Sequence, residues 1–228
     1  MQNKTWVISL GGSRIVPDEV DEKFLVKFKE LIESHPTQKF VVITGGGSTA
    51  RKYILALRKL GKKTKSQSMA GIAVTRLHAR FMSRFFGKIA NEDLPFNMKR
   101  VKSLLRGNQV VFCGALRYKK KNTSDGTAAK IAGYLKCPFI NLTNVKGLYS
   151  ADPRKDKKAK FIPKMSWKKF EEVIGKVKFE AGQHFVLDQA AAKIIKKEKI
   201  VTYIVGSLGA IDGILKGKKK IDGTLVMG

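Results

Sequence analysis

The sequence predicts an α/β fold in which a largely parallel β-sheet carries helices on both faces. Three observations support this prediction. Short apolar runs typical of buried strands alternate with amphipathic, helix-length segments along the whole chain. Two of these runs end directly in glycines that open a helix. No proline- or serine-rich linker and no fixed-period repeat interrupts the alternation, so we expect residues 1–228 to form one domain.

The first predicted strand is Thr5–Leu10, which is almost entirely apolar. Gly11, Gly12 and Ser13 follow it at once. Two glycines after a strand allow backbone N–H groups to approach a ligand closely. The helix that follows, about Val20–Ser34, repeats its apolar residues on one face, as a helix packed against a sheet does.

The same arrangement appears a second time. The strand Phe40–Thr44 is followed by three glycines and a serine, and a helix begins there. A helix N-terminus with free N–H groups is a natural seat for phosphate, so Gly46 and Gly47 mark a candidate anion site. Arg51 lies about one turn into this helix, where it either reaches a phosphate or is simply solvated. Two such turns in one chain are a stronger signal than one.

A long helix is expected over Met69–Phe86 and a shorter one over Pro95–Leu105. Three arginines recur every fourth residue on one face of the long helix. Arg80 and Arg84 are expected to be solvated, whereas Arg76 is a candidate for a more specific contact.

The stretch Asn122–Pro153 has the organisation of half a nucleotide-handling site. Thr123 caps a helix that begins near Asp125, and the strand Pro138–Leu142 leads into a polar loop with a tyrosine and an Asp-Pro pair. Loops after strands are where open α/β sheets bind ligands. Asp125 is therefore either a catalytic carboxylate or a first-turn acid that complements the helix dipole.

The other expected elements are a strand at Gln109–Cys113, helices at Met165–Ile174, Leu187–Glu198 and Leu208–Leu215, and strands at Ile200–Val205 and Gly223–Met227. The two cysteines, Cys113 and Cys137, sit near apolar runs and are expected to be reduced and partly buried. Of the histidines, His78 is expected to be structural, whereas His35 and His184 are expected in exposed loops.

The chain is strongly basic, with 46 Lys and Arg against 18 Asp and Glu and a formal net charge of +28. Such a field concentrates polyanions near the surface. Three interpretations stay open: solvated lysines of a lysine-rich proteome, attraction of phosphorylated substrates, and nucleic-acid binding. The basic clusters lack interleaved aromatic residues and no nucleic-acid-binding motif is visible, so we do not expect a nucleic-acid partner.

Several protein classes are excluded by absent patterns. No stretch approaches the roughly 18 apolar residues of a membrane span, and the first apolar run is too short for a secretion signal, which predicts a cytoplasmic protein without a membrane partner. The segment G-G-G-S lacks the ending of a Walker A loop, and no protein-kinase signature or G-x-S-x-G elbow occurs. His and Cys lack metal-ligand spacing, so we assign no metal-ligating residue.

The remaining pattern fits phosphoryl transfer, which needs phosphates held in line and charge stabilised between them. Here the chain resembles the amino acid kinase superfamily and, within it, the archaeal-type uridylate (UMP) kinases. The resemblance covers nearly the whole chain and rests on six segments in the family's order: Val7–Ser13, Val41–Ile54, Gly71–Arg80, Thr123–Ala129, Thr143–Pro153 and Asp188–Ile195.

The resemblance implies a three-layer α/β/α sandwich that transfers the γ-phosphate of ATP to UMP with Mg²⁺, in a homo-oligomer (a hexamer or a dimer). The implied residues are, for catalysis, Asp125 and Lys193; for ATP, Gly11, Gly12, Ser13, Thr143, Tyr149 and Asp152; and for the acceptor, Gly46, Gly47, Arg51, Ser68 and Thr123. Besides Asp125 and Arg51, simple alternatives stay open for two more of them, since Lys193 fits a surface lysine and Tyr149 fits loop packing.

The chain departs from the family pattern mainly on the acceptor side. Ser68 stands where the family usually has an Asp expected to hold the ribose, Ser48 replaces a Lys, and the loop Leu116–Asn122 is altered and longer. Two alternatives to a UMP kinase follow. One is a related phosphotransferase with another small phosphate acceptor, and the other is a non-catalytic, storage-type binder of nucleotides or oxyanions.

Overall fold

The apolar runs of the sequence form the centre of a seven-stranded sheet in the computed structural model, which describes residues 4–118, 123–151, 153, 156–176 and 187–228. The strand order is β3-β2-β1-β4-β8-β9-β7. In chain order these strands are β1 (Thr5–Leu10), β2 (Lys39–Thr44), β3 (Val110–Cys113), β4 (Phe139–Leu142), β7 (Lys164–Met165), β8 (Thr202–Val205) and β9 (Gly223–Val226).

The five strands from β3 to β8 are all parallel, and only β9 joins its neighbour β8 in the antiparallel direction. A separate two-stranded sheet pairs β5 (Leu148–Tyr149) with β6 (Phe161–Ile162). These findings confirm the predicted, mainly parallel sheet.

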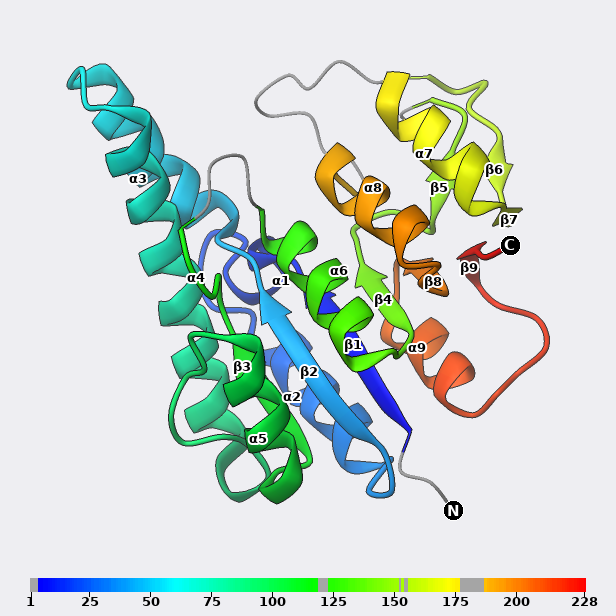
Figure 1. Ribbon diagram of the computed structural model, residues 1–228, viewed down its shortest axis with the longest axis horizontal. Coiled ribbons are helices and arrows are strands. Elements are labelled where there is room, and N and C mark those ends of the chain that lie inside the picture. The colour runs from blue at the N-terminus through cyan, green and yellow to red at the C-terminus, as the bar shows by residue number, and fades with distance from the viewer. Residues whose placement is uncertain (1–3, 119–122, 152, 154–155, 177–186) are drawn as a thin grey trace.

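Helices cover both faces of the sheet, which confirms the three-layer sandwich (Figure 1). One layer holds α1 (Gly12–Ile15), α2 (Glu22–Glu33), α4 (Thr64–Phe86) and α9 (Leu208–Leu215), and the other holds α5 (Met98–Gly107), α6 (Ser124–Leu135), α7 (Trp167–Lys176) and α8 (Gln189–Lys197). Strand β1 serves both cores, because Ile8 and Leu10 face the first layer and Val7 faces the second. The helix α3 (Gly47–Lys59) packs against α4 and extends with it beyond the sheet, and a 3₁₀ turn, η1 (Gly87–Ile89), follows α4.

The path of the chain creates a crevice at the carboxyl ends of the central strands. From β1 the chain moves outward through β2 and β3, and it then returns to β4 on the other side of β1. Connections on the two sides of such a switch point diverge, and open α/β sheets bind their ligands there. The loops that follow β1, β2 and β4 therefore meet at the predicted place.

Most predicted elements occur within a few residues of their expected bounds, but three details differ. The helix α4 begins at Thr64, five residues before its expected start, and its apolar residues Leu77 and Phe81 are 62% and 39% exposed. Tyr149 lies in β5 rather than in a loop, and Met165 belongs to β7 rather than to a helix. Two-residue strands depend on pairing with distant partners, which local periodicity does not reveal.

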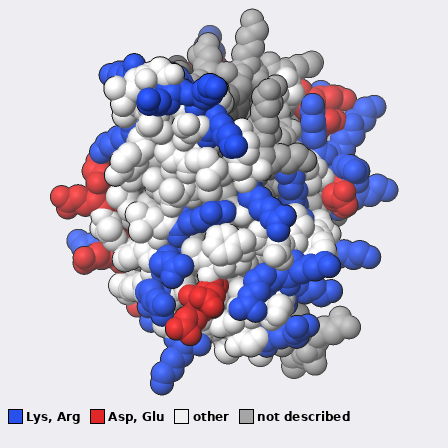
Figure 2. Space-filling model, turned by 60° about the vertical axis from the view of Figure 1, so that its left-hand side comes forward, with Lys and Arg blue, Asp and Glu red and all other residues white. Residues whose placement is uncertain are grey.

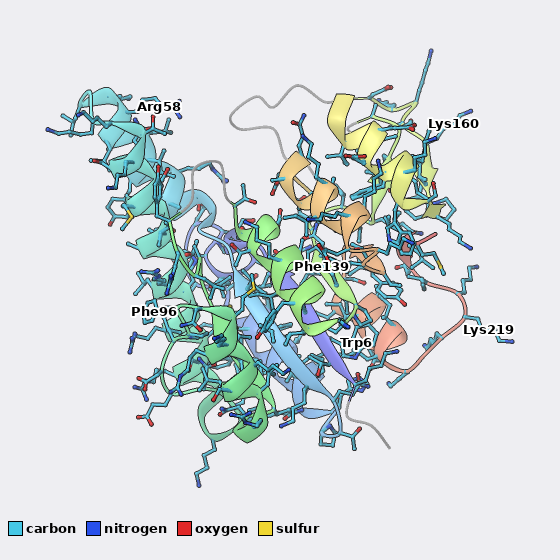
Figure 3. All side chains as sticks on the ribbon, viewed as in Figure 1. Trp6, Arg58, Phe96, Phe139, Lys160 and Lys219 are labelled. Atoms are coloured by element: carbon cyan, nitrogen blue, oxygen red, sulfur yellow. The ribbon has the colours of Figure 1, made fainter. Side chains whose placement is uncertain are left out.

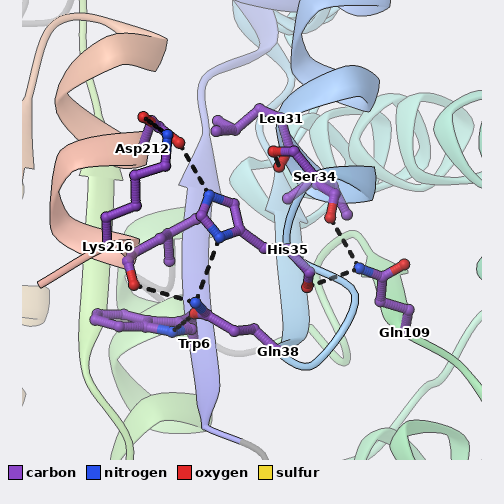
Figure 4. A network of polar contacts seen from close by, with 10 residues as sticks. Trp6, Leu31, Ser34, His35, Gln38, Gln109, Asp212 and Lys216 are labelled. Carbon is purple, nitrogen blue, oxygen red and sulfur yellow. Dashed lines mark hydrogen bonds and ion pairs between the residues drawn. The ribbon is translucent and has the colours of Figure 1, made fainter.

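The prediction for His35 was wrong, because this side chain is buried (Figure 4). Its Nε2 lies 3.0 Å from an Asp212 carboxylate oxygen, and its Nδ1 accepts from the Gln38 amide at 3.5 Å. The helix α9 covers the chain after α2 and buries it, although the sequence there is typical of a loop. His184 lies outside the described residues.

Two other predictions hold. His78 is buried, and its Nδ1 donates to the Gly45 carbonyl oxygen at 2.8 Å. Cys113 and Cys137 are free thiols, and burial raises the pKa of each to about 12.

On the face shown in Figure 2, basic side chains lie in several groups separated by uncharged areas. Figure 3 shows Lys160 and Lys219 at the outer edge of the molecule, whereas Phe139 lies in the sheet. Within the part of the chain that the structure describes, no helix has both the length and the apolar character needed to cross a bilayer.

Candidate active site

Two cavities of about 250 Å³ each open at the carboxyl end of the sheet and share Gly46, Gly47 and Ser124. The first, the β1–β4 cavity, is lined by Ser9, Gly11, Gly12, Ser13, Arg14, Gly45, Gly46, Gly47, Arg51, Ser124, Asp125, Asn141, Leu142, Thr143 and Asn144. The second, the α3–α4 cavity, is lined by Gly46, Gly47, Ala50, Ile54, Ser68, Gly71, Ile72, Thr75, Ala115, Arg117, Tyr118, Thr123 and Ser124.

The two glycine turns touch each other through their backbones. A Cβ atom added to Gly12 would lie 2.4 Å from the backbone nitrogen of Gly47, and one added to Gly47 would lie 2.6 Å from the carbonyl carbon of Gly12. Gly47 also has a φ of +59°, which favours glycine. The turns therefore form one continuous backbone surface with N–H groups at the starts of α1 and α3.

Asp125 lies in the first turn of α6 and lines the β1–β4 cavity. One of its oxygens accepts a hydrogen bond from the Ser9 hydroxyl at 2.6 Å. Desolvation raises its pKa to about 6, with a further rise from the nearby charge of Asp188 and an opposing effect from the Ser9 hydrogen bond. Ser9 stands next to Asn141 in the register of β1 and β4, so two polar side chains share one site at the end of these strands.

Thr123 connects the starts of two helices. Its hydroxyl oxygen accepts from the backbone nitrogen of Gly126 at 2.9 Å, which caps α6, and its hydroxyl donates to a carboxylate oxygen of Asp188. The other Asp188 oxygen accepts from the backbone nitrogen of Ala191 at 2.9 Å, which caps α8. The N-termini of α6 and α8 are thus fixed beside the same site.

Arg14 ties the first glycine turn to the ends of two strands. Its Nη2 donates to the carbonyl oxygens of Thr143 at 2.6 Å and Gly206 at 2.9 Å, the residues that follow β4 and β8. Its Nε is buried without a partner in the described part of the chain. Desolvation lowers the pKa of Arg14, and the charge of Asp21 opposes that shift.

Arg76 makes specific contacts with the segment after β3, whereas Arg80 and Arg84 are exposed and Arg84 forms a surface ion pair with Glu92. Its Nε donates to the Ala115 carbonyl at 3.1 Å and its Nη2 to the Leu116 carbonyl at 2.8 Å. The guanidinium also lies 4.7 Å from the ring centre of Phe96. Arg76 therefore fixes the segment after β3 that forms one wall of the α3–α4 cavity.

A match to the amino acid kinase family covers residues 4–206 of the chain. This protein belongs to that family. A uridylate kinase from Archaeoglobus fulgidus is 36% identical to it over 215 residues, which cover 93% of this chain and 94% of the relative. A uridylate kinase from Thermococcus kodakarensis is 30% identical over 224 residues, which cover 96% and 98%.

The solved structures support the same family assignment. The crystal structure of uridylate kinase from Archaeoglobus fulgidus has a TM-score of 0.84 at 35% identity and covers 97% of this chain and 99% of that one. The UMP kinase structure from Ureaplasma parvum has a TM-score of 0.81 over the full length of both chains; at 17% identity it shows the shared fold alone.

The fold brings together most of the residues that the family resemblance implies. Asp125, Gly11, Gly12, Ser13, Thr143 and Arg51 line the β1–β4 cavity, Ser68 and Thr123 line the α3–α4 cavity, and Gly46 and Gly47 line both. Two implied residues, Lys193 and Tyr149, line neither cavity: Lys193 is exposed on α8, and Tyr149 packs edge-on against Phe161. Asp152 lies outside the described residues.

Four further residues of this kinase-family site were not among the predicted ones: Ser9, Arg14, Asn141 and Asp188. Ser9 and Asn141 were detectable as single polar residues near the ends of apolar strands. Asp188 was detectable as an N-cap before a helical segment. Arg14 gave no such signal, because its partners are 129 and 192 residues away.

Proposed function

We propose that this protein transfers the γ-phosphate of ATP to a nucleoside monophosphate, with UMP as its acceptor. The relatives named uridylate kinase support this reaction. The observation that carries it is that two cavities meet at Gly46 and Gly47, with Asp125 beside their boundary. Two substrates bound in the two cavities meet with their phosphates at that boundary, as in-line transfer requires.

Each substrate has a cavity that suits it. The triphosphate of ATP fits the β1–β4 cavity, where the turn at Gly11, Gly12 and Ser13 offers backbone N–H groups and Thr143 begins the loop for the nucleoside. The acceptor phosphate fits the second glycine turn beside Arg51, whose planar fork binds phosphate. The acceptor nucleoside then extends between α3 and α4.

The donor set of the β1–β4 cavity fits Mg²⁺, although the described residues include no group of three or more metal-ligating side chains. Mg²⁺ is usually bound through one or two carboxylates together with substrate phosphates. Asp125 supplies the carboxylate, whose pKa burial raises to about 6. When bound, the ion would neutralise charge on the transferring phosphates.

Lys193 keeps its proposed catalytic role only if its exposed side chain turns toward the cavities. Its helix is held there, since Asp188 at the start of α8 accepts from Thr123. The competing role is that of a surface lysine. Lys193→Met, measured against the neighbouring Lys197→Met, separates the catalytic role from the surface role. If Lys193 is catalytic, Lys193→Met lowers kcat and Lys197→Met does not.

We propose a homo-oligomer in which α4 contacts a second copy of the chain. Met69, Leu77 and Phe81 are 44%, 62% and 39% exposed on this helix, which is more apolar surface than one isolated side chain provides. Light scattering on Leu77→Glu should give a smaller particle than the wild type. Val26→Glu on α2, where Val26 is 46% exposed, should leave the mass unchanged. A monomeric wild type contradicts the proposal.

Release of ADP, measured with UMP, CMP, GMP, AMP and isopentenyl phosphate in turn, tests the reaction. We expect the highest kcat/KM with UMP. Higher turnover with another acceptor would make that compound the substrate in place of UMP, and the proposed phosphoryl transfer would still hold. Tight binding of ATP without ADP release, in folded protein with Mg²⁺ and all acceptors, rejects catalysis and favours the storage-type alternative.

A further inference from the structure

The α3–α4 cavity has no carboxylate among the described residues that line it. Its polar side chains are the exposed Arg117 and five hydroxyl-bearing residues, namely Ser68, Thr75, Tyr118, Thr123 and Ser124. The Thr75 hydroxyl already donates to the Ile72 carbonyl and accepts from the Ala115 nitrogen, and the Thr123 hydroxyl is used by the caps of α6 and α8. Ser68, half-buried on α4, is the remaining hydroxyl on the wall that α4 forms.

Ser68 lines the same cavity as the second glycine turn, within reach of the sugar of a nucleotide whose phosphate lies at that turn. The second glycine turn touches α4 at Gly71, since a Cβ on Gly46 would lie 3.7 Å from the Gly71 carbonyl oxygen. Ser68 precedes Gly71 by three residues, which is about 4.5 Å along a helix. A ribose ring lies about this far from its own 5′-phosphate, given the two bonded atoms between them. The sugar of a nucleotide whose phosphate lies at the glycine turn can therefore reach this part of α4.

A single hydroxyl recognises a sugar diol weakly. A carboxylate accepts hydrogen bonds from both hydroxyls at once, and it is left unpaired and partly desolvated when one of them is missing. A serine hydroxyl donates or accepts as needed, and water can satisfy it on the half-buried wall where Ser68 lies. The loss of one sugar hydroxyl therefore leaves no buried charge without a partner.

From this arrangement we infer that the acceptor site takes 2′-deoxyribonucleoside monophosphates as well as ribonucleoside monophosphates, with dUMP as the substrate beside UMP. The expected phosphorylation of dUMP rests on the proposed function, whereas the expected binding of dUMP does not depend on catalysis. A site built to bind a hydroxyl rejects the analogue without it by about 10⁴–10⁵-fold, whereas a site that is not so built discriminates by about 10²-fold or less. We expect UMP and dUMP to differ by less than about 100-fold in kcat/KM.

Calorimetric binding of UMP and of dUMP to the full chain, followed by ADP release with each nucleotide, tests the inference. We expect wild-type affinities within about tenfold of each other, which corresponds to the loss of one solvent-accessible hydrogen bond. Ser68→Asp should raise the preference for UMP at least about tenfold, because the new carboxylate accepts from both ribose hydroxyls. Ser66→Asp is the matched control: it adds the same charge to an exposed position of the same helix, and its preference should equal that of the wild type.

A wild-type preference for UMP above about 100-fold overturns the inference, because it would require a group dedicated to the 2′-hydroxyl. A folded Ser68→Asp protein with unchanged preference overturns it as well, since the sugar would then lie elsewhere. If Ser68→Asp does not fold, the wild-type ratio alone decides. If neither nucleotide is phosphorylated but both bind equally, the proposed function fails while the inference about the sugar stands.

Discussion

The two ends of the central sheet use buried polar groups in opposite ways. At the amino end, His35, Gln38, Asp212, Trp6 and Gln109 bind one another and nearby carbonyls (Figure 4). At the carboxyl end, in the described part of the chain, Asp125 accepts a single hydrogen bond from Ser9, and the Nε of Arg14 has no partner. The first network is complete in the protein alone, whereas the second leaves hydrogen-bonding capacity for a ligand.

This difference has an energetic consequence. The rise in the pKa of Asp125 from 3.8 to about 6 corresponds to a cost of up to about 3 kcal/mol for holding the carboxylate ionised near pH 7. In contrast, hydrogen bonds from Lys216 and His35 lower the pKa of Asp212, whose ionised form the fold therefore stabilises. The ionised Asp125 therefore destabilises the folded protein at the carboxyl end of the sheet, whereas the ionised Asp212 stabilises it at the amino end.

The largest expected effect is that of Asp125→Asn. We expect kcat to fall by about 10²–10³-fold or more, because charge on the transferring phosphates is no longer organised. A coupled ADP-release assay measures this loss, with Asp93→Asn, an exposed acid outside the cavities, as the control. Near-wild-type kcat would remove Asp125 from the mechanism and break the comparison of the two ends.

The same variant should be more stable than the wild type near pH 7. The folded-state pKa of Asp125 lies above its usual value, so burying this side chain costs least when it is protonated. The wild type is therefore most stable relative to the variant below about pH 4, and it loses that stability as the pH rises through about 6. Melting temperatures should therefore favour Asp125→Asn by several degrees near pH 7 and converge near pH 4. A constant difference across this range would contradict the assigned pKa.

Gly12→Ala should rank next, because the backbone itself is the functional group at the carboxyl end. Its Cβ would meet the Gly47 nitrogen at 2.4 Å and force the two glycine turns apart. We expect a loss of about 2–3 kcal/mol in unfolding free energy and at least about 100-fold in kcat/KM. At Gly11 the nearest atom to an added Cβ is 3.9 Å away, so Gly11→Ala should melt within about 2 °C of the wild type. Equal melting temperatures for the two variants would contradict this packing.

His35→Ala tests the amino end of the sheet, where we expect an effect on stability and little effect on catalysis. It removes a partner from both Asp212 and Gln38, so unfolding should become about 2–3 kcal/mol easier while kcat changes less than about twofold. Denaturant titration and the ADP-release assay report the two quantities. A large drop in kcat with unchanged stability would show that this network acts on the active site.

Arg14→Lys should have the smallest effect of these changes. Lysine keeps the charge but lacks the rigid planar guanidinium whose Nη2 donates to both the Thr143 and the Gly206 carbonyl. We expect KM for ATP to rise about tenfold, with kcat nearly unchanged, because the loop that receives the nucleoside is less well held. Lys23→Arg, an exposed exchange on α2 that also conserves the charge, is the control for swapping these two side chains outside the site. An unchanged KM would mean that Arg14 serves the fold alone.

The sequence identified those features that depend on neighbours along the chain. Strand and helix periods predicted the layers, and glycines directly after two strands predicted the turns where the cavities meet. The N-cap Thr123 and the first-turn Asp125 were visible for the same reason. Each of these signals spans only a few residues, and helix caps and turn geometry are local properties.

Only the tertiary structure decided which distant residues meet. Arg14 reaches carbonyls 129 and 192 residues away, and His35 reaches Asp212 across 177 residues, so neither contact leaves a trace in local periodicity. The close approach of Gly12 to Gly47 is likewise set by the pairing of β1 with β2. By itself, the sequence determined the elements and the kind of chemistry they carry. The packing of the sheet decided which polar groups are satisfied within the protein and which stay available to a ligand, because burial and partner choice depend on contacts across the whole fold.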